Sequence, residues 1–409
     1  MRAAAAAFLA CLAVGLALRI HAGLRTDTLE KLRDSGRADY FAFSASLREN
    51  RVLGWGGLPS AFRGPVYPAF LAAVESFEPG KRPASPLVEA SLCSLEIPLA
   101  GWLAWGVAGP WAGVAAAGLA ALHPALSRPL PACRVEPVYG LLVLLLAVWL
   151  AEWGRKPGAA RALGAGFILS VTLLCRSSLV LFPVVLLASL VLSREKSRTW
   201  QRSVWVLAGA SFLFLFPWVL RNGLQFNRFI PLEDHAADRN FIAAVDGVIV
   251  NLEGPSPDGR REIPFDQLGE RRLRALGKIA EDPLPYLASC IKRFGVMAGW
   301  HGPLLFLAGL GFLAFRRDPA ILILGLLAAT FFLTHAPLSL EARYVEPILP
   351  VLAVLGGVGG LEWVKSAGWM TGPFVEPPAK ASAWIRWSVL GLGGVFYGFV
   401  LWRLAAEFF

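Results

Sequence analysis

The sequence predicts an all-α protein that crosses a membrane many times. Of its 409 residues, 56% are hydrophobic and only 17% are charged, whereas soluble domains carry about 25% charged residues. Apolar runs recur along the whole length, and a helix of about 20 apolar residues spans a lipid bilayer. We therefore expect one polytopic domain over residues 1–409, with about eleven transmembrane helices.

The expected spans follow one another with few long gaps. They cover 3–20, 87–106, 108–124, 137–152, 162–175, 178–192, 204–220, 300–315, 319–335, 345–363 and 384–403. Several are shorter than about 20 residues, so we expect some helices to bend or to stop part-way. The first span has a weakly basic start and no small-residue cleavage site after it, so we interpret it as a retained helix.

The orientation of the spans follows from the basic residues in the short loops. The positive-inside rule places such loops on the cytoplasmic side. If the short apolar run 67–77 is a re-entrant helix on the outer side, these basic residues all share the side of the N-terminus. They are Arg155, Lys156, Arg161, Arg194, Lys196, Arg198, Arg202, Arg316, Arg317, Lys365, Lys380 and Arg386. A first loop, 21–86, and a long loop, 222–293, then lie outside, and 366–383 is an inner linker.

The first outer loop carries an acid beside an aromatic residue, Asp39-Tyr40, and ends at Arg63 and Tyr67. The apolar residues of 38–47 recur at helical spacing, which predicts an amphipathic juxtamembrane helix. Asp39 would then lie at the water edge of the bilayer, where a carboxylate stays ionised. An ordinary interfacial helix with a solvated acid explains the same pattern. A second surface helix is expected at 265–279.

Charged and aromatic residues recur at the outer ends of later spans. They are Arg134, Glu136, Arg176, Arg221, Asn222, Arg343 and Tyr344. Each alone also fits a helix start, a local ion pair or an interfacial anchor. Together with Asp39 they place two carboxylates and several arginines on one membrane face, where an amphiphilic anion would dock. A carboxylate there can act as a general base, and arginines can stabilise the charge on a departing phosphate.

The same residues match a known family pattern. The chain resembles the GT-C fold integral membrane glycosyltransferases of the protein O-mannosyltransferase and aminoarabinose-transferase type (glycosyltransferase family 39). That family's first outer loop contains an acid, Tyr and Ala-x-x-Leu, and ends in Arg-Pro-Pro-x-Tyr-Pro. Here Asp39-Tyr40-Phe-Ala-Phe-Ser-Ala-Ser-Leu and Arg63-Gly-Pro-Val-Tyr-Pro match it, with Gly64 in place of the first Pro. An acid that opens a span, Pro-Trp-x-x-Arg-Asn and a late Arg-Tyr match further on. Ser177 follows Arg176 where Arg-Pro is common.

The resemblance implies an inverting glycosyltransferase that moves a sugar from a polyprenyl-phosphate donor to an acceptor on the outer, periplasmic face. It implies Asp39 as the catalytic base. The expected substrate-binding residues are Tyr40, Arg63, Tyr67, Arg134, Glu136, Arg176, Arg221, Asn222, Arg343 and Tyr344. The expected partners are the donor, a lipid, glycan or protein acceptor, and membrane lipids. The family's distribution and the Ala-, Gly- and Arg-rich composition favour a bacterial inner membrane in the cell envelope.

Other functions stay open at this point. A transporter or lipid-carrier flippase should carry ionisable residues mid-span, and Glu96 is one. A non-catalytic membrane assembly partner should tolerate loss of Asp39. A divalent metal ion could be shared by Asp39, Glu136 and His235, although no spacing demands one, and the five scattered Cys residues favour neither a zinc site nor a disulfide framework. The net charge of +10 lies largely in short loops, so it does not indicate nucleic acid.

Overall fold

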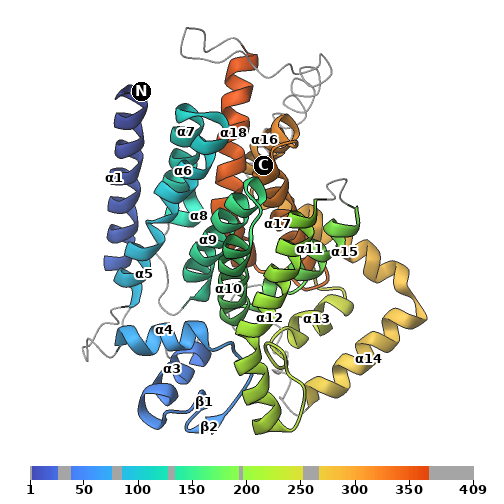
Figure 1. Ribbon diagram of the computed structural model, residues 1–409. Helices are drawn as coiled ribbons and strands as arrows, with labels where there is room; N and C mark the ends of the chain where they lie inside the picture. The colour runs from blue at the N-terminus through green and yellow to red at the C-terminus, as the bar shows by residue number, and fades with distance from the viewer. Residues whose placement is uncertain are drawn as a thin grey trace, which may run out of the picture.

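The structure is a computed structural model that describes residues 2–25, 38–75, 85–127, 134–192, 197–251 and 267–367. It is mostly helical, and a bundle of helices forms the larger part of it (Figure 1). The helices of the bundle are α1 (Arg2–Leu24), α5 (Ser85–Cys93), α6 (Glu96–Ala108), α7 (Pro110–Leu122), α8 (Pro124–Ser127), α9 (Val135–Arg155), α10 (Ala159–Cys175), η1 (Ser177–Leu179), α11 (Phe182–Leu192), α12 (Arg198–Phe226), α15 (Pro283–Trp300), α16 (Gly302–Phe315), α17 (Pro319–His335), η3 (Ala342–Ile348) and α18 (Leu349–Ser366).

Five helical stretches of the described chain are long and apolar enough to cross a membrane. They are Arg2–Leu24, Ser85–Ala108, Val135–Arg155, Arg198–Phe226 and Ala342–Ser366. The pair α15 and α16, bent by 95°, makes a sixth if it counts as one broken span. Four shorter apolar helices are Pro110–Leu122, Ala159–Cys175, Ser177–Ala188 and Pro319–His335. Every expected span except 384–403 falls on one of these helices. That last span lies outside the described residues, so the count of about eleven is not confirmed.

Small residues let the bundle helices approach closely. A Cβ atom on Gly359 of α18 would lie 1.9 Å from the carbonyl oxygen of Leu307 in α16, and one on Gly357 would lie 2.5 Å from the backbone nitrogen of Ala116 in α7. In a membrane, apolar side chains gain little from leaving lipid for protein, so close backbone contact supplies much of the helix packing. The result is a tightly packed support beneath the loops at one end.

A buried ion pair and its hydrogen bonds join the four helices α1, α5, α6 and α7 within this support. Arg19 of α1 lies 3.0 Å from the carboxylate of Glu96 in α6, and both side chains are 3% exposed. Arg19 also donates hydrogen bonds to the carbonyl oxygens of Cys93 and of Ala120 in α7. Glu96 is the mid-span acid that the transporter hypothesis required. Because Glu96 pairs with Arg19, its position inside the bundle is explained by a role in holding helices together.

The segments expected on the outer side gather at the end of the molecule opposite the N-terminus (Figure 1). Helix α3 (Ala38–Asn50) covers the segment expected at 38–47, and α4 (Val66–Glu75) covers the described part of the apolar run 67–77, whose re-entrant placement stays a prediction. A two-stranded hairpin, β1 (Gly54–Trp55) and β2 (Leu58–Pro59), lies between them. Its strands are joined by two glycines with positive φ, the conformation that such a tight turn requires.

The long loop contributes two further helices, α13 (Asp238–Val245) and α14 (Leu268–Glu281), of which α14 is the expected surface helix. Residues 265 and 266 lie outside the described chain. The sequence did not predict α15, because two prolines and the pair Lys292-Arg293 interrupt its apolar run. Arg293 is nevertheless fully buried, with its guanidinium bound to the carbonyl oxygens of Ala244, Val248 and Ala336.

Candidate active site

A cavity of about 250 Å³ opens where the bundle meets the gathered loops. We call it the arginine cavity, because Arg63 and Arg176 line it from two different loops. Its other polar lining residues include Ser177, next to Arg176, and Glu233, Asn240 and Tyr344 from further stretches of the chain. Residues far apart in sequence thus converge on one space, as a ligand site requires.

Arg63 is held in place by an acid and two aromatic rings. Its Nη2 atom donates to the Asp39 carboxylate over 2.8 Å, and its guanidinium carbon lies 4.8 Å from the ring centre of Tyr40 and 4.5 Å from that of Phe62. Burial alone would lower the pKa of Arg63, but attraction to Tyr40 and Asp39 outweighs it and raises the pKa. Arg63 is therefore a fixed cation. Its buried Nε–H has no hydrogen-bond partner among the described residues.

Tyr40 and Tyr67 form the support behind Arg63. Their rings meet edge to face at 5.0 Å, and the Tyr67 hydroxyl donates to Glu89 over 2.8 Å. Burial raises the pKa of Tyr40, so its hydroxyl stays protonated. Neither tyrosine lines the arginine cavity. The structure thus places these two predicted binding residues beneath Arg63, where they orient it.

Arg176 is the second fixed cation of the cavity. Its Nη1 atom donates to Glu136 over 2.6 Å, and its guanidinium carbon lies 4.9 Å from the ring centre of Tyr344. Burial opposes its charge, yet the nearby Glu136 carboxylate raises the pKa of Arg176 above its usual value. Glu136 is 3% exposed and also lies 3.8 Å from Nε of Arg343. This carboxylate is a buried counter-ion for two arginines, which fixes their orientation.

Glu233 is a cavity residue that the sequence did not single out. The Ser177 hydroxyl donates to its Oε2 atom over 2.6 Å, while its Oε1 atom is buried without a hydrogen-bond partner in the described part of the chain. The backbone is anchored on both sides of it. The Leu232 carbonyl accepts from Trp218 over 2.7 Å, and the Asp234 amide donates to Ala61 over 2.8 Å. An acid beside Asp234 in a long mixed-charge loop gave no sequence signal of this placement.

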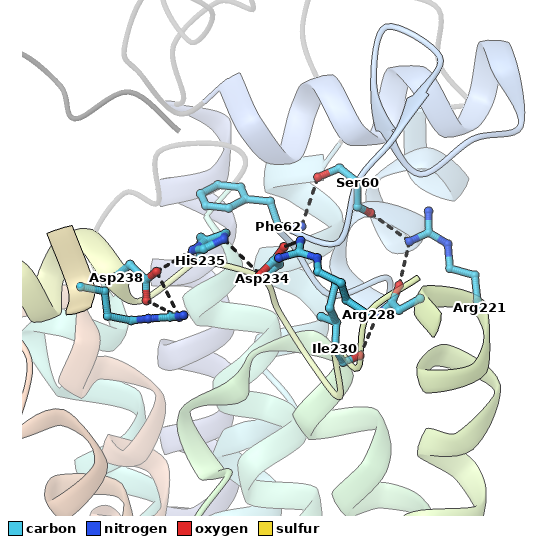
Figure 2. Close-up of polar contacts among 10 residues, drawn as sticks. Ser60, Phe62, Arg221, Arg228, Ile230, Asp234, His235 and Asp238 are labelled. Carbon is cyan, nitrogen blue, oxygen red and sulfur yellow. Dashed lines mark hydrogen bonds and ion pairs between the residues drawn. The ribbon is translucent and has the colours of Figure 1, made fainter. Parts of the chain in front are cut away.

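Arg134, Arg221 and Asn222 are further predicted binding residues that do not line the arginine cavity. Arg221 donates to the carbonyl oxygens of Ser60 at 3.1 Å and Leu53 at 3.3 Å, and Asn222 donates to Ile230 at 3.0 Å. Figure 2 shows the contact of Arg221 with Ser60, where the first loop meets the end of α12. Arg221 and Asn222 therefore join two loops. Arg134 directly precedes α9 and does not line the cavity.

The three candidate metal ligands are not brought together. Asp39 pairs with Arg63, Glu136 pairs with Arg176, and His235 contacts Asp238 at 2.6 Å and Asp234 at 3.4 Å. Within the ranges that the structure describes, no group of three or more His, Cys, Asp or Glu side chains is arranged to hold a metal ion. Asp39 and Glu136 are instead engaged with arginines, and His235 with two neighbouring aspartates.

Comparison with known proteins was made by sequence and by structure. No family model and no curated protein matches the sequence. A crystal structure of ArnT from Cupriavidus metallidurans, bound to undecaprenyl phosphate, matches over 98% of this chain and 72% of its own, with a TM-score of 0.53 and 15% identity. The archaeal oligosaccharyltransferase AglB from Archaeoglobus fulgidus, in complex with an inhibitory peptide and a dolichol-phosphate, matches over 95% of this chain with a TM-score of 0.55 and 14% identity. The chain spans 54% of AglB, about half its length.

The helices and the structural likeness define an integral membrane protein of helical, multi-spanning type. ArnT and AglB are GT-C glycosyltransferases, and this chain shares their fold. The resemblance drawn from the loop motifs is thereby confirmed at the level of the fold.

Proposed function

We propose that the protein is an inverting glycosyltransferase that moves a sugar from a polyprenyl-phosphate donor to an acceptor. The observation that carries the proposal is the convergence of Arg63 and Arg176 on one cavity, each with a carboxylate fixed behind it. A planar guanidinium binds phosphate oxygens through two parallel hydrogen bonds. The solved ArnT and AglB contain undecaprenyl phosphate and dolichol-phosphate, which are lipids of this class.

The chemistry follows from where charge moves. A base takes the proton of the acceptor hydroxyl or amine, and the freed electron pair forms a bond to the anomeric carbon. The bond from that carbon to the phosphate oxygen breaks, and its electrons leave with the lipid phosphate. Direct displacement inverts the anomeric centre. Arg63 and Arg176 stabilise the growing phosphate charge, a contribution of about 2.7–4 kcal/mol for one well-placed donor in other enzymes.

Asp39 is the proposed base. Its side chain is 34% exposed, so a substrate can reach it. In the free protein, the Asp39 carboxylate forms an ion pair with Arg63. A phosphate that binds Arg63 would compete with Asp39 for that cation and leave the carboxylate free to face the acceptor. We propose that this site lies on the outer, periplasmic face of a bacterial inner membrane. We also propose that the protein is a single domain with about eleven spans and with the loop boundaries that the sequence predicts.

A transfer assay with purified protein tests the proposal. It would use a set of polyprenyl-phosphate sugars as donors and membrane extract as acceptor. We expect Asp39→Asn to keep the shape and lose about 100-fold or more in transfer, the range of a general base. Asp246→Asn is the matched control, because Asp246 is half exposed and pairs with Lys278 on the surface. It should transfer like the wild type.

The other outcomes separate the alternatives. Equal transfer by Asp39→Asn and wild type would move the base to another residue. Absence of transfer with every donor, together with tight binding of undecaprenyl phosphate, would favour a lipid carrier. Absence of both transfer and lipid-phosphate binding in a folded protein would overturn the enzyme proposal in favour of an assembly partner.

A further inference from the structure

A second cavity lies directly beside the arginine cavity. Its volume is about 340 Å³, and His235 is on its wall, so we call it the histidine cavity. The two cavities share lining residues, namely Ser177, Glu233, Ala236 and Ala237. A molecule in the histidine cavity would therefore be separated from the lipid-phosphate site by little more than Glu233 and its neighbours.

The charges of the histidine cavity differ from those of its neighbour. Its two arginines are both paired, Arg228 with Asp234 at 2.6 Å and Arg272 with Asp238 at 3.3 Å. His235 lies between the two aspartates (Figure 2). Because aspartates neutralise Arg228 and Arg272, and Glu233 adds a further carboxylate, the cavity does not favour an anion. It presents carboxylate oxygens, which accept hydrogen bonds from hydroxyl groups.

The backbone of this wall is held in a costly conformation. His235 has a φ of 60°, in the left-handed region that side chains other than Gly seldom adopt. The hydrogen bond of the Asp234 amide to Ala61 and the ion pairs on either side keep it there. Such strain persists where the surroundings determine it, and it recurs at ligand sites. The wall is thus a built feature that joins the long loop to the first loop.

The rim of the cavity adds an apolar platform. Phe229 lines the cavity and is 78% exposed. A sugar ring has an apolar C–H face and a rim of hydroxyl groups, so it packs on an aromatic ring while carboxylates accept from its hydroxyls. An exposed ring beside paired aspartates therefore matches a neutral saccharide better than a peptide or a lipid chain.

We propose that the histidine cavity binds a neutral saccharide as the acceptor, and that Glu233 positions its reacting hydroxyl toward the arginine cavity. The inference rests on the proposed glycosyl transfer and names its acceptor class. The buried Oε1 atom of Glu233 accepts a hydrogen bond from a hydroxyl of the saccharide next to the reacting one, while Ser177 holds Oε2. Glu233 acts as a positioning residue, and the proton goes to the base.

The test measures donor and acceptor separately on the full chain. Binding of undecaprenyl phosphate is followed first, and saturation-transfer NMR then detects a neutral alkyl glycoside, a serine-rich peptide or a long-chain alcohol. We expect the glycoside alone to bind, and Phe229→Ala to weaken it about tenfold while Phe229→Trp restores it. Glu233→Gln should raise the acceptor KM about tenfold and leave the donor KM within twofold. Glu270→Gln, in an exposed pair on α14, is the matched control and should change neither.

The failures are distinguishable. If undecaprenyl phosphate does not bind and no sugar is transferred, the proposed function itself fails. If the donor binds and sugar is transferred to the peptide or the alcohol, and the Phe229 and Glu233 variants keep the wild-type acceptor KM, only the acceptor assignment is overturned. Glycoside binding unchanged by Phe229→Ala would place the saccharide elsewhere and also overturn it.

Discussion

The structure uses arginine–carboxylate pairs in two different settings. In the bundle, Arg19 and Glu96 are both 3% exposed, and Arg19 also binds two backbone carbonyls. At the arginine cavity, the side chains of Arg63 and Arg176 are 23% and 18% exposed, and both line open space. The residue types are the same. What separates a packing element from a candidate phosphate site is whether the guanidinium keeps access to a ligand.

The largest expected effect breaks the pair in the bundle. Arg19→Met leaves the Glu96 carboxylate buried without its cation, and loss of one partner of a buried pair costs about 3–5 kcal/mol. We expect a large fall in melting temperature in detergent. The double variant Arg19→Met with Glu96→Met should recover most of that stability, because it removes both buried charges.

Transfer activity tests whether the Arg19–Glu96 pair in the bundle has only a packing role. The double bundle variant should transfer sugar at the wild-type rate per folded molecule, since neither Arg19 nor Glu96 lines the arginine cavity or the histidine cavity. Loss of transfer in a stable double variant would contradict the packing role and revive the transporter hypothesis for Glu96.

The next effect breaks the pair at the cavity. Arg176→Gln combined with Glu136→Gln removes both charges of this pair, and Arg343, the other arginine beside Glu136, keeps Glu341 as its partner. We expect transfer to fall by about 10²–10³-fold, the effect of losing one electrostatic donor in an active site, with weaker binding of undecaprenyl phosphate. The melting temperature should change less than in Arg19→Met. Wild-type transfer and lipid binding in this double variant would show that Arg176 has no part in phosphate binding.

The sequence predicted the residues of the site better than their partners. Arg176 and Tyr344 stand beside span ends, Asp39 and Arg63 lie in the first outer loop, and local pattern is enough to single them out. The pairings of Asp39 with Arg63 and of Glu136 with Arg176 join residues 24 and 40 positions apart. They depend on how α3, α9 and α10 approach one another, which local periodicity does not record.

The sequence also could not decide the role of Arg221. A Pro-Trp-x-x-Arg-Asn element at a span end fits a phosphate clamp and a loop anchor alike. Arg221 lies against the carbonyl oxygens of Leu53 and Ser60 because the hairpin folds over the end of α12. Glu233 was missed for the complementary reason, since its place on both cavities is set by contacts of its neighbours with Trp218 and Ala61.

The smallest expected effect concerns Gly64, which stands next to Arg63. A Cβ atom there would lie 2.1 Å from the carbonyl oxygen of Leu174, two residues before Arg176. This contact explains why Gly occupies a position where the family motif has Pro. Gly64→Ala must push the first loop away from the end of α10, and overpacking of this kind costs about 1–3 kcal/mol.

Because that movement separates the two cavity arginines, we expect Gly64→Ala to weaken undecaprenyl phosphate binding and lower transfer about tenfold, which corresponds to about 1.4 kcal/mol. Gly209→Ala is the matched control, since a Cβ there meets nothing within 4 Å. It should leave binding and transfer unchanged. If Gly64→Ala lowered the melting temperature but kept wild-type affinity for the lipid phosphate, the spacing of Arg63 and Arg176 would not set that affinity. The lipid phosphate would then be bound by one arginine at a time, and the distance between Arg63 and Arg176 would not contribute to catalysis.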